Sequence, residues 1–254
     1  MTDLTDRTVL ITGASRGIGY ETARVLGEAG CNVIAHYGGY REGAVDATAG
    51  VPEDRKMIVQ ADLATPGAAA ELWNEAVVWR GRVDVVVNNA AIMPEVGIED
   101  AEADWEDALA AAFAINVMAP AVLIRLAALH FIANGGGVLI TMSSWAAHRG
   151  SGNPKLAAYA ASKAALAAVT KTMARAHARD GVLGYCIAPG TVRTDMSVRS
   201  ARNQGGEDAV TASLTMGEWV PPREVADLVA FLASGTRRHL SGATLDINGA
   251  SYIR

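Results

Sequence analysis

The chain has 254 residues, of which 50% are hydrophobic and 19% are charged, with a formal net charge of −5 at pH 7. This composition is typical of a well-packed globular protein and excludes a disordered or fibrous chain. Acidic and basic residues do not cluster into runs of one sign, so no footprint for nucleic acid or an anionic membrane surface is present. We therefore expect a small-molecule ligand.

The sequence also bears on the cellular location of the protein and on whether it binds a metal ion. Residues 1–7 lack the basic patch and apolar stretch of a secretory signal, and no apolar run approaches the ~20 residues that span a bilayer. Cys31 and Cys186 fall at or within apolar strand-like runs, which favours buried, reduced thiols. The five histidines show no spacing that would gather metal ligands. We expect a cytoplasmic protein without membrane contact and without a metal site.

Short apolar runs rich in β-branched residues alternate along the chain with longer helical patterns. In chain order, the runs predict strands at residues 8–12, 32–36, 56–60, 83–88, 137–142, 182–188 and 243–247. The segments between them predict helices near 18–29, 66–80, 102–133, 157–179 and 222–234. This alternation predicts an α/β fold: a doubly wound (Rossmann) parallel sheet of seven strands with helices on both faces, in a single domain over residues 1–254.

Residues 197–220 interrupt this pattern. The segment has poor periodicity, carries several arginines and glycines, and ends at Pro221 and Pro222. Ligands of open parallel sheets bind beyond the carboxyl ends of the strands, and a long insertion there can cover a substrate. We expect a mobile substrate lid at about 195–220, with an irregular surface loop as the alternative.

A glycine-rich turn, Thr12-Gly13-Ala14-Ser15-Arg16-Gly17-Ile18-Gly19, directly follows the first predicted strand. Gly13 permits a tight turn, Gly17 lets the backbone approach a pyrophosphate, and Gly19 allows close packing of helix and strand. The N-terminus of the following helix offers free N–H groups to the anion. We expect cofactor contacts along this turn, from Gly13, Ser15, Arg16, Gly17, Ile18 and Gly19.

The same residues also match the G-x-S-x-G elbow of α/β-hydrolases, in which Ser15 would be a nucleophile. A hydrolase elbow follows several strands, one of which supplies an oxyanion-hole N–H. Only 14 residues precede Ser15. The order of elements therefore favours a dinucleotide site.

The end of the second predicted strand bears on the choice of coenzyme. NAD-binding folds usually place an acid there to hold the ribose hydroxyls, whereas this strand ends Ala35-His36-Tyr37-Gly38. Without that carboxylate a 2′-phosphate is not repelled, and Arg16 and Arg41 can supply positive charge. We expect NADP(H) in preference to NAD(H), with His36, Tyr37 and Arg41 near its adenosine end.

Tyr159 and Lys163 lie four positions apart in a predicted helix, on one face and within side-chain reach. A free phenol has a pKa near ~10, and lowering it to about 7 requires roughly 4 kcal/mol of phenolate stabilisation. An ammonium ~5 Å away contributes about 3 kcal/mol at an effective dielectric of ~20, and an oxidised nicotinamide could add a similar amount. The pair can therefore act as an acid/base. The alternative is an aromatic residue half-buried beside a solvated lysine.

These signals occur together with others in a fixed order, and by them the whole chain resembles the short-chain dehydrogenase/reductase family. Within that family, the likeness is to the 3-oxoacyl-[acyl-carrier-protein] reductase-like branch. The resemblance rests on Thr12 to Gly19, Asp62-Leu63, Asn88-Asn89-Ala90, Asn116, Ser143-Ser144, Tyr159 with Lys163, and Pro189-Gly190-Thr191-Val192-Arg193-Thr194.

The resemblance implies a role for each motif. Tyr159 would be the acid/base, Lys163 would bind the ribose and lower the tyrosine pKa, and a serine would polarise the substrate carbonyl. Asn116 would hold a water in a proton relay. Further cofactor contacts would come from Asp62, Leu63, Asn89, Ala90, Pro189, Gly190, Val192 and Thr194.

Two departures from the family pattern affect the substrate side. Ala91 replaces a usual glycine, and the spacing from Ser144 to Tyr159 is about two residues longer than usual, so the intervening loop is enlarged. Strand alternation points Ser143 and Ser144 to opposite faces, so only one can act. We expect Ser144 to act, with Ser143 as the alternative. Substrate contacts are expected from Met93, Ser144, Trp145, His148 and Tyr159.

The helix over 157–178 contains 11 alanines in 22 residues, and the resemblance implies that it pairs across a subunit interface. We expect a homo-oligomer, either tetramer or dimer. The function indicated is interconversion of a carbonyl and a secondary alcohol with NADP(H). A sugar or polyol dehydrogenase using NAD is an alternative. A noncatalytic NADP(H)-sensing oligomer is another, although a sensor would not need Asn116, Ser144, Tyr159 and Lys163.

Overall fold

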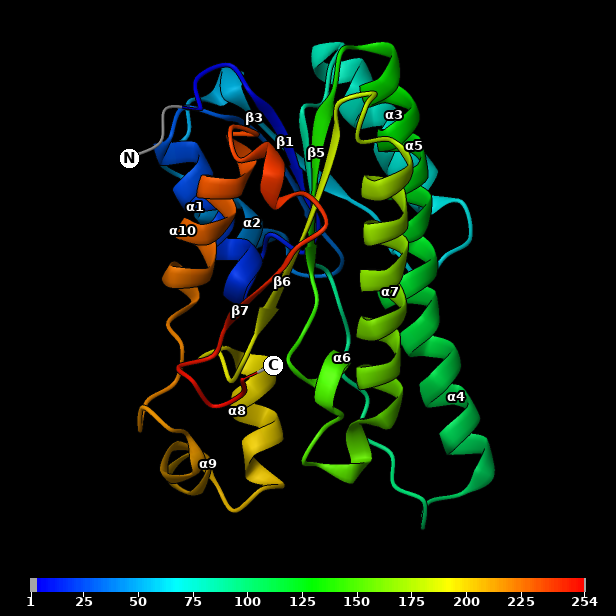
Figure 1. Cartoon of the computed structure of the whole chain (residues 1–254), viewed down its shortest axis with the longest axis vertical. Coiled ribbons are helices and arrows are strands. Elements are labelled where there is room, and N and C mark those ends of the chain that lie inside the picture. Colours follow the sequence, from blue (N-terminus) through cyan, green and yellow to red (C-terminus); the bar gives the residue numbers. More distant parts are fainter. Residues whose placement is uncertain (1–3, 254) are drawn as a thin grey trace.

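The computed structural model describes residues 4–253, and its centre is a parallel sheet of seven strands. The strand order is β3-β2-β1-β4-β5-β6-β7, so the chain runs outward from β1 in one direction and then from β4 in the other (Figure 1). This confirms the expected fold class. The strands are β1 (Thr8–Ile11), β2 (Asn32–Tyr37), β3 (Lys56–Gln60), β4 (Val85–Asn88), β5 (Gly137–Met142), β6 (Val182–Pro189) and β7 (Thr244–Ile247).

Helices cover both faces of the sheet because successive residues of each strand point to opposite faces. On β1, for example, Val9 and Ile11 belong to one buried apolar cluster and Leu10 to the other. The first face carries α1 (Gly17–Glu28), α2 (Arg41–Ala47) and α10 (Pro222–Ala233). The second carries α3 (Ala68–Arg80), α4 (Glu102–Phe113), α5 (Ala119–Ala133) and α7 (Ala157–Ala176) (Figure 1).

Short helical turns complete the chain between these elements. They are η1 (Glu53–Arg55), η2 (Ala114–Met118), α6 (Ala146–Arg149), η3 (Pro154–Leu156) and η4 (Arg238–Leu240). Of these, η2 is a π-helical turn and joins α4 to α5. The turn η2 lies within the helix predicted near 102–133. The sequence pattern predicted neither α2 nor the other turns, because a segment of three to seven residues is too short to show helical periodicity.

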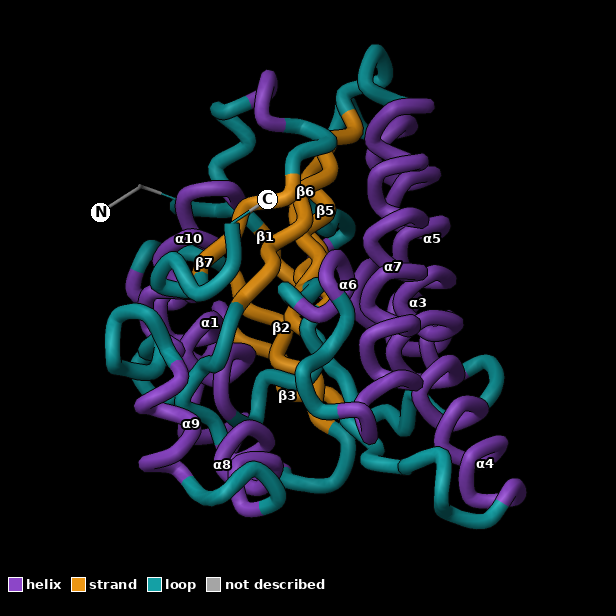
Figure 2. Tube along the Cα trace, turned by 60° about the horizontal axis from the view of Figure 1, so that its bottom comes forward, coloured by secondary structure: helices purple, strands orange, loops and turns teal. Residues whose placement is uncertain are grey.

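The segment expected to be a mobile lid is ordered into two helices, α8 (Asp195–Arg202) and α9 (Glu207–Ser213). They pack around a small apolar cluster of their own, with Ala201, Val210 and Trp219 buried in it. Trp219 Nε1 also donates a hydrogen bond of 2.7 Å to Thr211 Oγ1 on α9. The sequence pattern did not predict these helices, because each spans only about two turns and neither shows its periodicity in the sequence. Figure 2 shows both helices at the carboxyl ends of the strands.

The helical stretch Glu102–Ala133 contradicts the expectation that no apolar run is long enough to span a bilayer. It is 32 residues long with a mean hydropathy of 1.9 in its most apolar part, which suffices for a membrane span by length and composition. A core helix of a globular protein passes the same test. Here α5 buries Leu123, Ile124 and Phe131 completely against the sheet.

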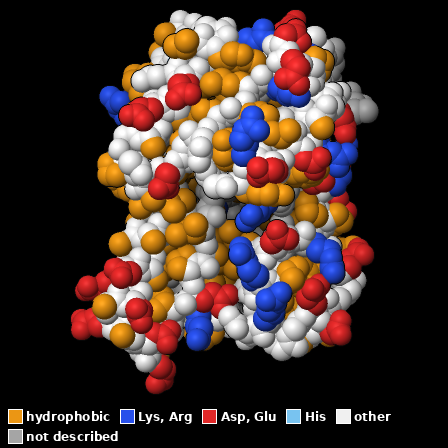
Figure 3. All heavy atoms as spheres, turned by 180° about the vertical axis from the view of Figure 1, so that it is seen from behind, with side chains coloured by type: hydrophobic (Ala, Val, Ile, Leu, Met, Phe, Trp, Pro, Cys, Tyr) orange, Lys and Arg blue, Asp and Glu red, His pale blue; other side chains and the backbone are white. Residues whose placement is uncertain are grey.

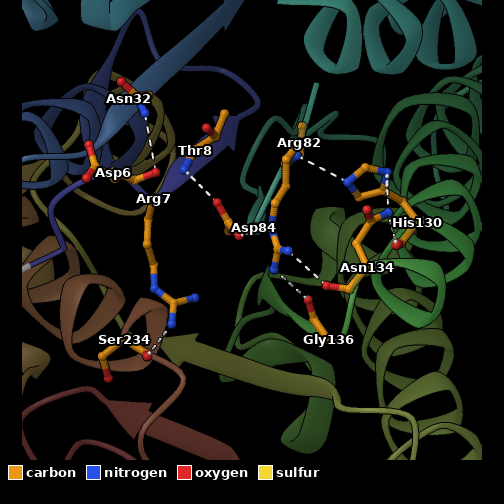
Figure 4. Close-up of polar contacts among 11 residues, drawn as sticks. Asp6, Arg7, Thr8, Asn32, Arg82, Asp84, His130, Asn134, Gly136 and Ser234 are labelled. Atoms are coloured by element: carbon orange, nitrogen blue, oxygen red, sulfur yellow. Dashed lines mark hydrogen bonds and ion pairs between the residues drawn. The ribbon is translucent and has the colours of Figure 1, made fainter. Parts of the chain in front are cut away.

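At the amino ends of the strands, a polar network joins the sheet to the surrounding segments (Figure 4). Thr8 N–H donates to Asp84 Oδ2 at 2.9 Å, and Arg82 donates to the other oxygen of the same carboxylate. Arg82 also donates to the carbonyl oxygen of Asn134 at 2.8 Å, and Val83 N–H donates to His130 Nε2 at 3.3 Å. The network fixes the start of β1 against the start of β4.

We predict that Asp84→Ala lowers the free energy of unfolding by about 1–3 kcal/mol, because it leaves a buried Thr8 N–H without an acceptor. Urea denaturation followed by circular dichroism measures this. Asp84→Asn is the matched control and should lose less, because its amide oxygen can still accept from Thr8. A loss below about 0.5 kcal/mol for Asp84→Ala would contradict the role assigned to this network.

Candidate active site

A cavity of about 390 Å³ lies at the carboxyl ends of the strands, where the glycine turn, the ends of β2 to β6 and α8 meet. It brings together most residues that the sequence predicted for a cofactor. Those in its wall are Gly13, Ser15, Arg16, Gly17, Ile18, His36, Asp62, Leu63, Asn89, Ala90, Tyr159, Lys163, Pro189, Gly190, Val192 and Thr194. Gly19, Tyr37 and Arg41 lie outside the wall.

The glycine turn has the geometry that an anion cradle requires. Gly13 and Gly17 have φ of +70° and +54°, in the left-handed region that favours glycine. A Cβ at Gly19 would collide with the Gly13 carbonyl oxygen, so this residue acts by packing α1 against the turn. Within the described residues, no side chain caps the start of α1 at Arg16, which leaves the amides of its first turn as donors for a phosphate. The residues present therefore fit a dinucleotide.

Asn89 and Thr12 hold the turn in place from the end of β4. Asn89 Nδ2 donates to the carbonyl oxygens of Thr12 and Gly13, at 2.9 and 3.2 Å. Thr12 Oγ1 in return accepts from the backbone amides of Asn89 and Ala90, both at 3.0 Å. Asn89 therefore supports the cofactor pocket by hydrogen-bonding to the backbone of the glycine turn.

At the adenosine end, two of the expected contacts have other roles. Tyr37 is only 7% exposed and packs in the core, because strand alternation turns it away from the cavity. Arg41 is exposed at the start of α2 and lies outside the cavity wall. Arg16 does reach the cavity, with its guanidinium carbon 4.5 Å from the ring centroid of Tyr40. The sequence did not indicate this tyrosine, because no motif marks a stacking partner.

A glycine on α2 makes room for the Tyr40 ring. A Cβ at Gly43 would collide with the Ser15 carbonyl oxygen and would meet the Tyr40 ring at 2.5 Å. The absent side chain therefore lets α2 approach the glycine turn closely, with Tyr40 between Gly43 and Arg16. Gly38, also at the cavity wall, has open space where a side chain would lie.

Tyr159 and Lys163 project from α7 into the same cavity. Lys163 is 3% exposed; its Nζ donates to the carbonyl oxygen of Met142 at 2.8 Å and lies 5.8 Å from the centroid of the Tyr159 ring. Burial lowers the pKa of Lys163 to about 8. The ammonium is therefore still mostly protonated at neutral pH but loses its charge at mildly alkaline pH.

The pKa of Tyr159 in the protein without cofactor lies far above the value near 7 that we expect with both Lys163 and an oxidised nicotinamide beside it. Burial raises this pKa to about 12, and a hydrogen bond with the side chain of Ser144 lowers it only in part. The expected value took account of the attraction of nearby positive charges and left out the desolvation of the phenolate. Lys163 alone therefore does not make Tyr159 an acid of neutral pH.

The two serines have different partners. Ser144 hydrogen-bonds to the Tyr159 side chain, and its Oγ accepts from Ala146 N–H at 3.1 Å. Ser143 lines the cavity, but its Oγ donates to the Lys163 carbonyl oxygen at 3.4 Å. Ser144, which was expected to contact the substrate, lies outside the cavity wall, but it is the serine whose hydrogen bond lowers the pKa of Tyr159.

Asn116 is fully buried in the π-helical turn between α4 and α5. Its Oδ1 accepts from Ile92 N–H at 2.9 Å, and its Nδ2 donates to the Ile92 carbonyl oxygen and to Ser162 Oγ, each at 2.9 Å. Both amide hydrogens are used, so the side chain fixes the loop after β4 to α7. π-Helical turns occur often at functional sites. No sequence pattern predicted that this turn would be π-helical.

The substrate side of the cavity differs from the expectation. Met93, Trp145 and His148 lie outside its wall, which is formed here by Ile92, Ile115, Met142 and Met196. Trp145 instead packs against the apolar cluster of the lid helices, with the Arg149 guanidinium 4.1 Å from its ring centroid. Trp145 of the enlarged loop after β5 thus faces the lid helices. The sequence spacing indicates the length of this loop but not the direction of its side chains.

The start of α4 and the end of α8 carry opposite charges. The first turn of α4 carries Glu102 and Asp104, and the last turn of α8 carries Arg199 and Arg202. Figure 3 shows acidic side chains gathered at the lower left, whereas basic and acidic side chains are interspersed at the lower right. Arg199 also lines the cavity itself.

Comparison with known proteins decides the family. The family model described as Enoyl-(Acyl carrier protein) reductase matches residues 13–250. The chain belongs to the short-chain dehydrogenase/reductase family. This short-chain dehydrogenase/reductase is 33% identical to 3-oxoacyl-[acyl-carrier-protein] reductase FabG of Rickettsia felis, over 100% of both chains. It is 32% identical to 3beta-hydroxysteroid dehydrogenase 1 of Eggerthella lenta, over 99% of this chain and 95% of the relative.

A solved structure agrees with these sequence relatives. The 3-oxoacyl (acyl-carrier-protein) reductase of Agrobacterium tumefaciens C58, solved with NADP bound, superimposes with a TM-score of 0.86 at 30% identity, over 97% of this chain and 94% of that one. The chain is therefore an NAD(P)-dependent oxidoreductase acting on carbonyl and alcohol groups.

Proposed function

We propose that this short-chain dehydrogenase/reductase interconverts a carbonyl and a secondary alcohol with NADP(H), using Tyr159 as the acid/base. The observation that carries the proposal is that Tyr159 and the buried Lys163 line the same cavity as the glycine turn, with Ser144 next to Tyr159 and lowering its pKa. A binding-only protein would need the glycine turn but not this triad.

In the proposed reaction, each group of cavity residues has a separate role. The glycine turn would hold the pyrophosphate, and Asp62 and Leu63 would flank the adenine. Pro189, Gly190 and Thr194 would hold a nicotinamide, which would supply the hydride and, when oxidised, a positive charge. Ser144 donates to the substrate oxygen, and Tyr159 gives that oxygen its proton in reduction or removes it in oxidation. The positive charge of the Lys163 ammonium stabilises the phenolate. Lys163 loses this charge as the pH rises through its pKa of about 8.

Loss of the tyrosine proton donor should remove the chemistry and leave cofactor binding intact. We predict that Tyr159→Phe and Ser144→Ala each lower kcat by about 10²-fold or more, while Ser143→Ala changes it less than about tenfold. The assay follows NADPH absorbance with a panel that includes a 3-oxoacyl thioester, a ketosteroid and a keto sugar. Turnover in Tyr159→Phe equal to that of the wild-type enzyme would contradict the proposal.

The coenzyme choice rests on Arg16. The Arg16 guanidinium stacks on Tyr40 at the cavity wall. The strand β2 ends without a carboxylate, and Gly38, which follows it, has open space where a side chain would lie. A structural relative was solved with NADP bound. These observations favour a 2′-phosphate at this position and therefore NADP(H) over NAD(H).

Removal of the Arg16 charge should weaken NADPH binding specifically. We predict that Arg16→Gln raises KM for NADPH by about tenfold or more, the value of one lost charge-assisted hydrogen bond, and leaves KM for NADH nearly unchanged. Arg41→Gln is the matched control and should change neither value. An equal effect of Arg16→Gln on both coenzymes, or a wild-type preference for NADH, would contradict the assignment.

The substrate proposed is a small carbonyl compound whose body contacts the apolar wall of Ile92, Ile115, Met142 and Met196. The names of the relatives span acyl-carrier-protein thioesters and hydroxysteroids, so the panel covers both. No feature of the described cavity favours a sugar or polyol. Cys31 and Cys186 are buried thiols, which supports a reducing, cytoplasmic location.

We also propose that the protein is a homo-oligomer, either tetramer or dimer. The helical stretch from α4 to α5 leaves apolar side chains exposed at helical spacing, among them Met118 at 63% and Leu129 at 54%. Exposed apolar stripes of this kind mark interfaces. Light scattering should give a multiple of the 26.4 kDa chain mass, and Leu129→Glu should reduce it. A wild-type monomer mass would contradict this proposal.

A further inference from the structure

His36, the side chain at the end of β2, uses both nitrogens of its ring. Nδ1 accepts a hydrogen bond from Gly13 N–H at 3.1 Å, and Nε2 lies 2.9 Å from the carbonyl oxygen of Ala61, to which it donates. An amide can only donate and a carbonyl can only accept. The two bonds together therefore require a neutral imidazole with its proton on Nε2.

Gly13 and Ala61 follow β1 and β3, the two strands on either side of β2. β2 lies between β1 and β3, so the end of β2 separates the glycine turn from the loop after β3. Gly13, His36 and Ala61 all line the cavity. Backbone bonds already extend the ladder there, from Ala14 N–H to the His36 carbonyl oxygen and from Ala61 N–H to the Tyr37 carbonyl oxygen. The His36 ring adds a side-chain bridge that sets the separation of the glycine turn from the loop after β3.

We propose that His36 is a positioning residue of the cofactor site, whose neutral ring fixes the glycine turn against the Ala61 loop and whose protonation releases the turn and weakens dinucleotide binding. This inference rests on the proposed function, because it concerns the same cavity.

Protonation would set an N–H of the ring against the Gly13 N–H, two donors facing each other, and would break the bond between them. The ring is 2% exposed, and burial lowers the pKa of His36 below its ordinary value of 6.5. Within the described residues, no charged side chain hydrogen-bonds to the ring. The titratable groups on the elements around it are Arg16, Tyr20, Glu21, Arg24, Glu28, Cys31, Tyr37, Tyr40, Arg41, Glu42, Asp46, Lys56 and Asp62.

The sign of the pH dependence follows from this arrangement. If the cofactor binds the form with neutral His36, its affinity is full above the pKa of this group. As the pH falls through that pKa, the affinity falls by up to about tenfold per pH unit. The loss occurs below pH 6.5, because the pKa is shifted downward.

The test measures binding of NADH and NADPH by quenching of tryptophan fluorescence between about pH 5 and 8, with circular dichroism confirming the fold at each pH. NADH is the informative ligand, because the 2′-phosphate of NADPH titrates by itself near pH ~6. His36→Gln is the matched variant, since its amide offers a donor and an acceptor that do not titrate. His36→Ala offers neither.

We expect wild-type affinity for NADH to fall in acid, His36→Gln to lose this dependence, and His36→Ala to bind NADH several-fold more weakly at neutral pH. An acid loss that persists in His36→Gln, or wild-type affinity in His36→Ala, would overturn the inference. Failure of the wild-type protein to bind either coenzyme at any pH would instead contradict the proposed function.

A second measurement needs no variant that might misfold. The pKa of His36 is followed by NMR of the wild-type protein with and without saturating NADH. Because coupling between two binding events is reciprocal, bound NADH must lower the pKa of His36. An unchanged pKa would overturn the inference even if every variant folded poorly.

Discussion

Desolvation of the pair Tyr159 and Lys163 is the constraint on which the proposed chemistry depends. Both groups lie where α7 crosses the carboxyl ends of the central strands, and burial disfavours the charged form of each. A phenol with a pKa of about 12 cannot exchange protons readily at neutral pH. The same low-dielectric setting strengthens every charge brought beside it. In the proposed mechanism, the positive charge of the oxidised nicotinamide lowers the pKa of Tyr159, so that cofactor binding and acid/base chemistry are coupled.

The rest of the fold serves this arrangement by fixing distances between elements that are remote in sequence. The order of the strands places β1, β2 and β4 side by side, so the glycine turn, His36 and Asn89 meet at one end of the sheet. Asn89 braces the turn from one side and His36 from the other. Asn116 ties the loop after β4 to the helix that carries Tyr159. These polar contacts are buried or partly buried, which favours satisfied hydrogen bonds that keep the site in shape.

Much of the fold and the site could be predicted from the sequence, for reasons that are local. Seven apolar runs predict the strands because a buried parallel strand needs β-branched residues on both faces. Gly13, Gly17 and Tyr159 stand in motifs whose spacing itself determines the geometry. The features that could not be predicted depend on long-range packing. Tyr37 is buried in the core because of strand alternation. Trp145 packs against the lid helices and lies outside the cavity wall. The stacked pair Tyr40 and Arg16 comes from different loops. The pKa of Tyr159 was misjudged because the depth of its burial is not visible in a helical pattern.

The pKa of the Tyr159 phenol, with and without NADP⁺, tests this coupling most directly. Ultraviolet difference titration of the wild-type protein against Tyr159→Phe isolates the absorbance of this one tyrosinate. We predict a pKa of about 12 for the protein alone, and a fall of several units, toward about 7, when NADP⁺ is bound. A pKa that stays near 12 in the complex would show that the cofactor does not activate this tyrosine, and cofactor binding and acid/base chemistry would then not be coupled in this protein.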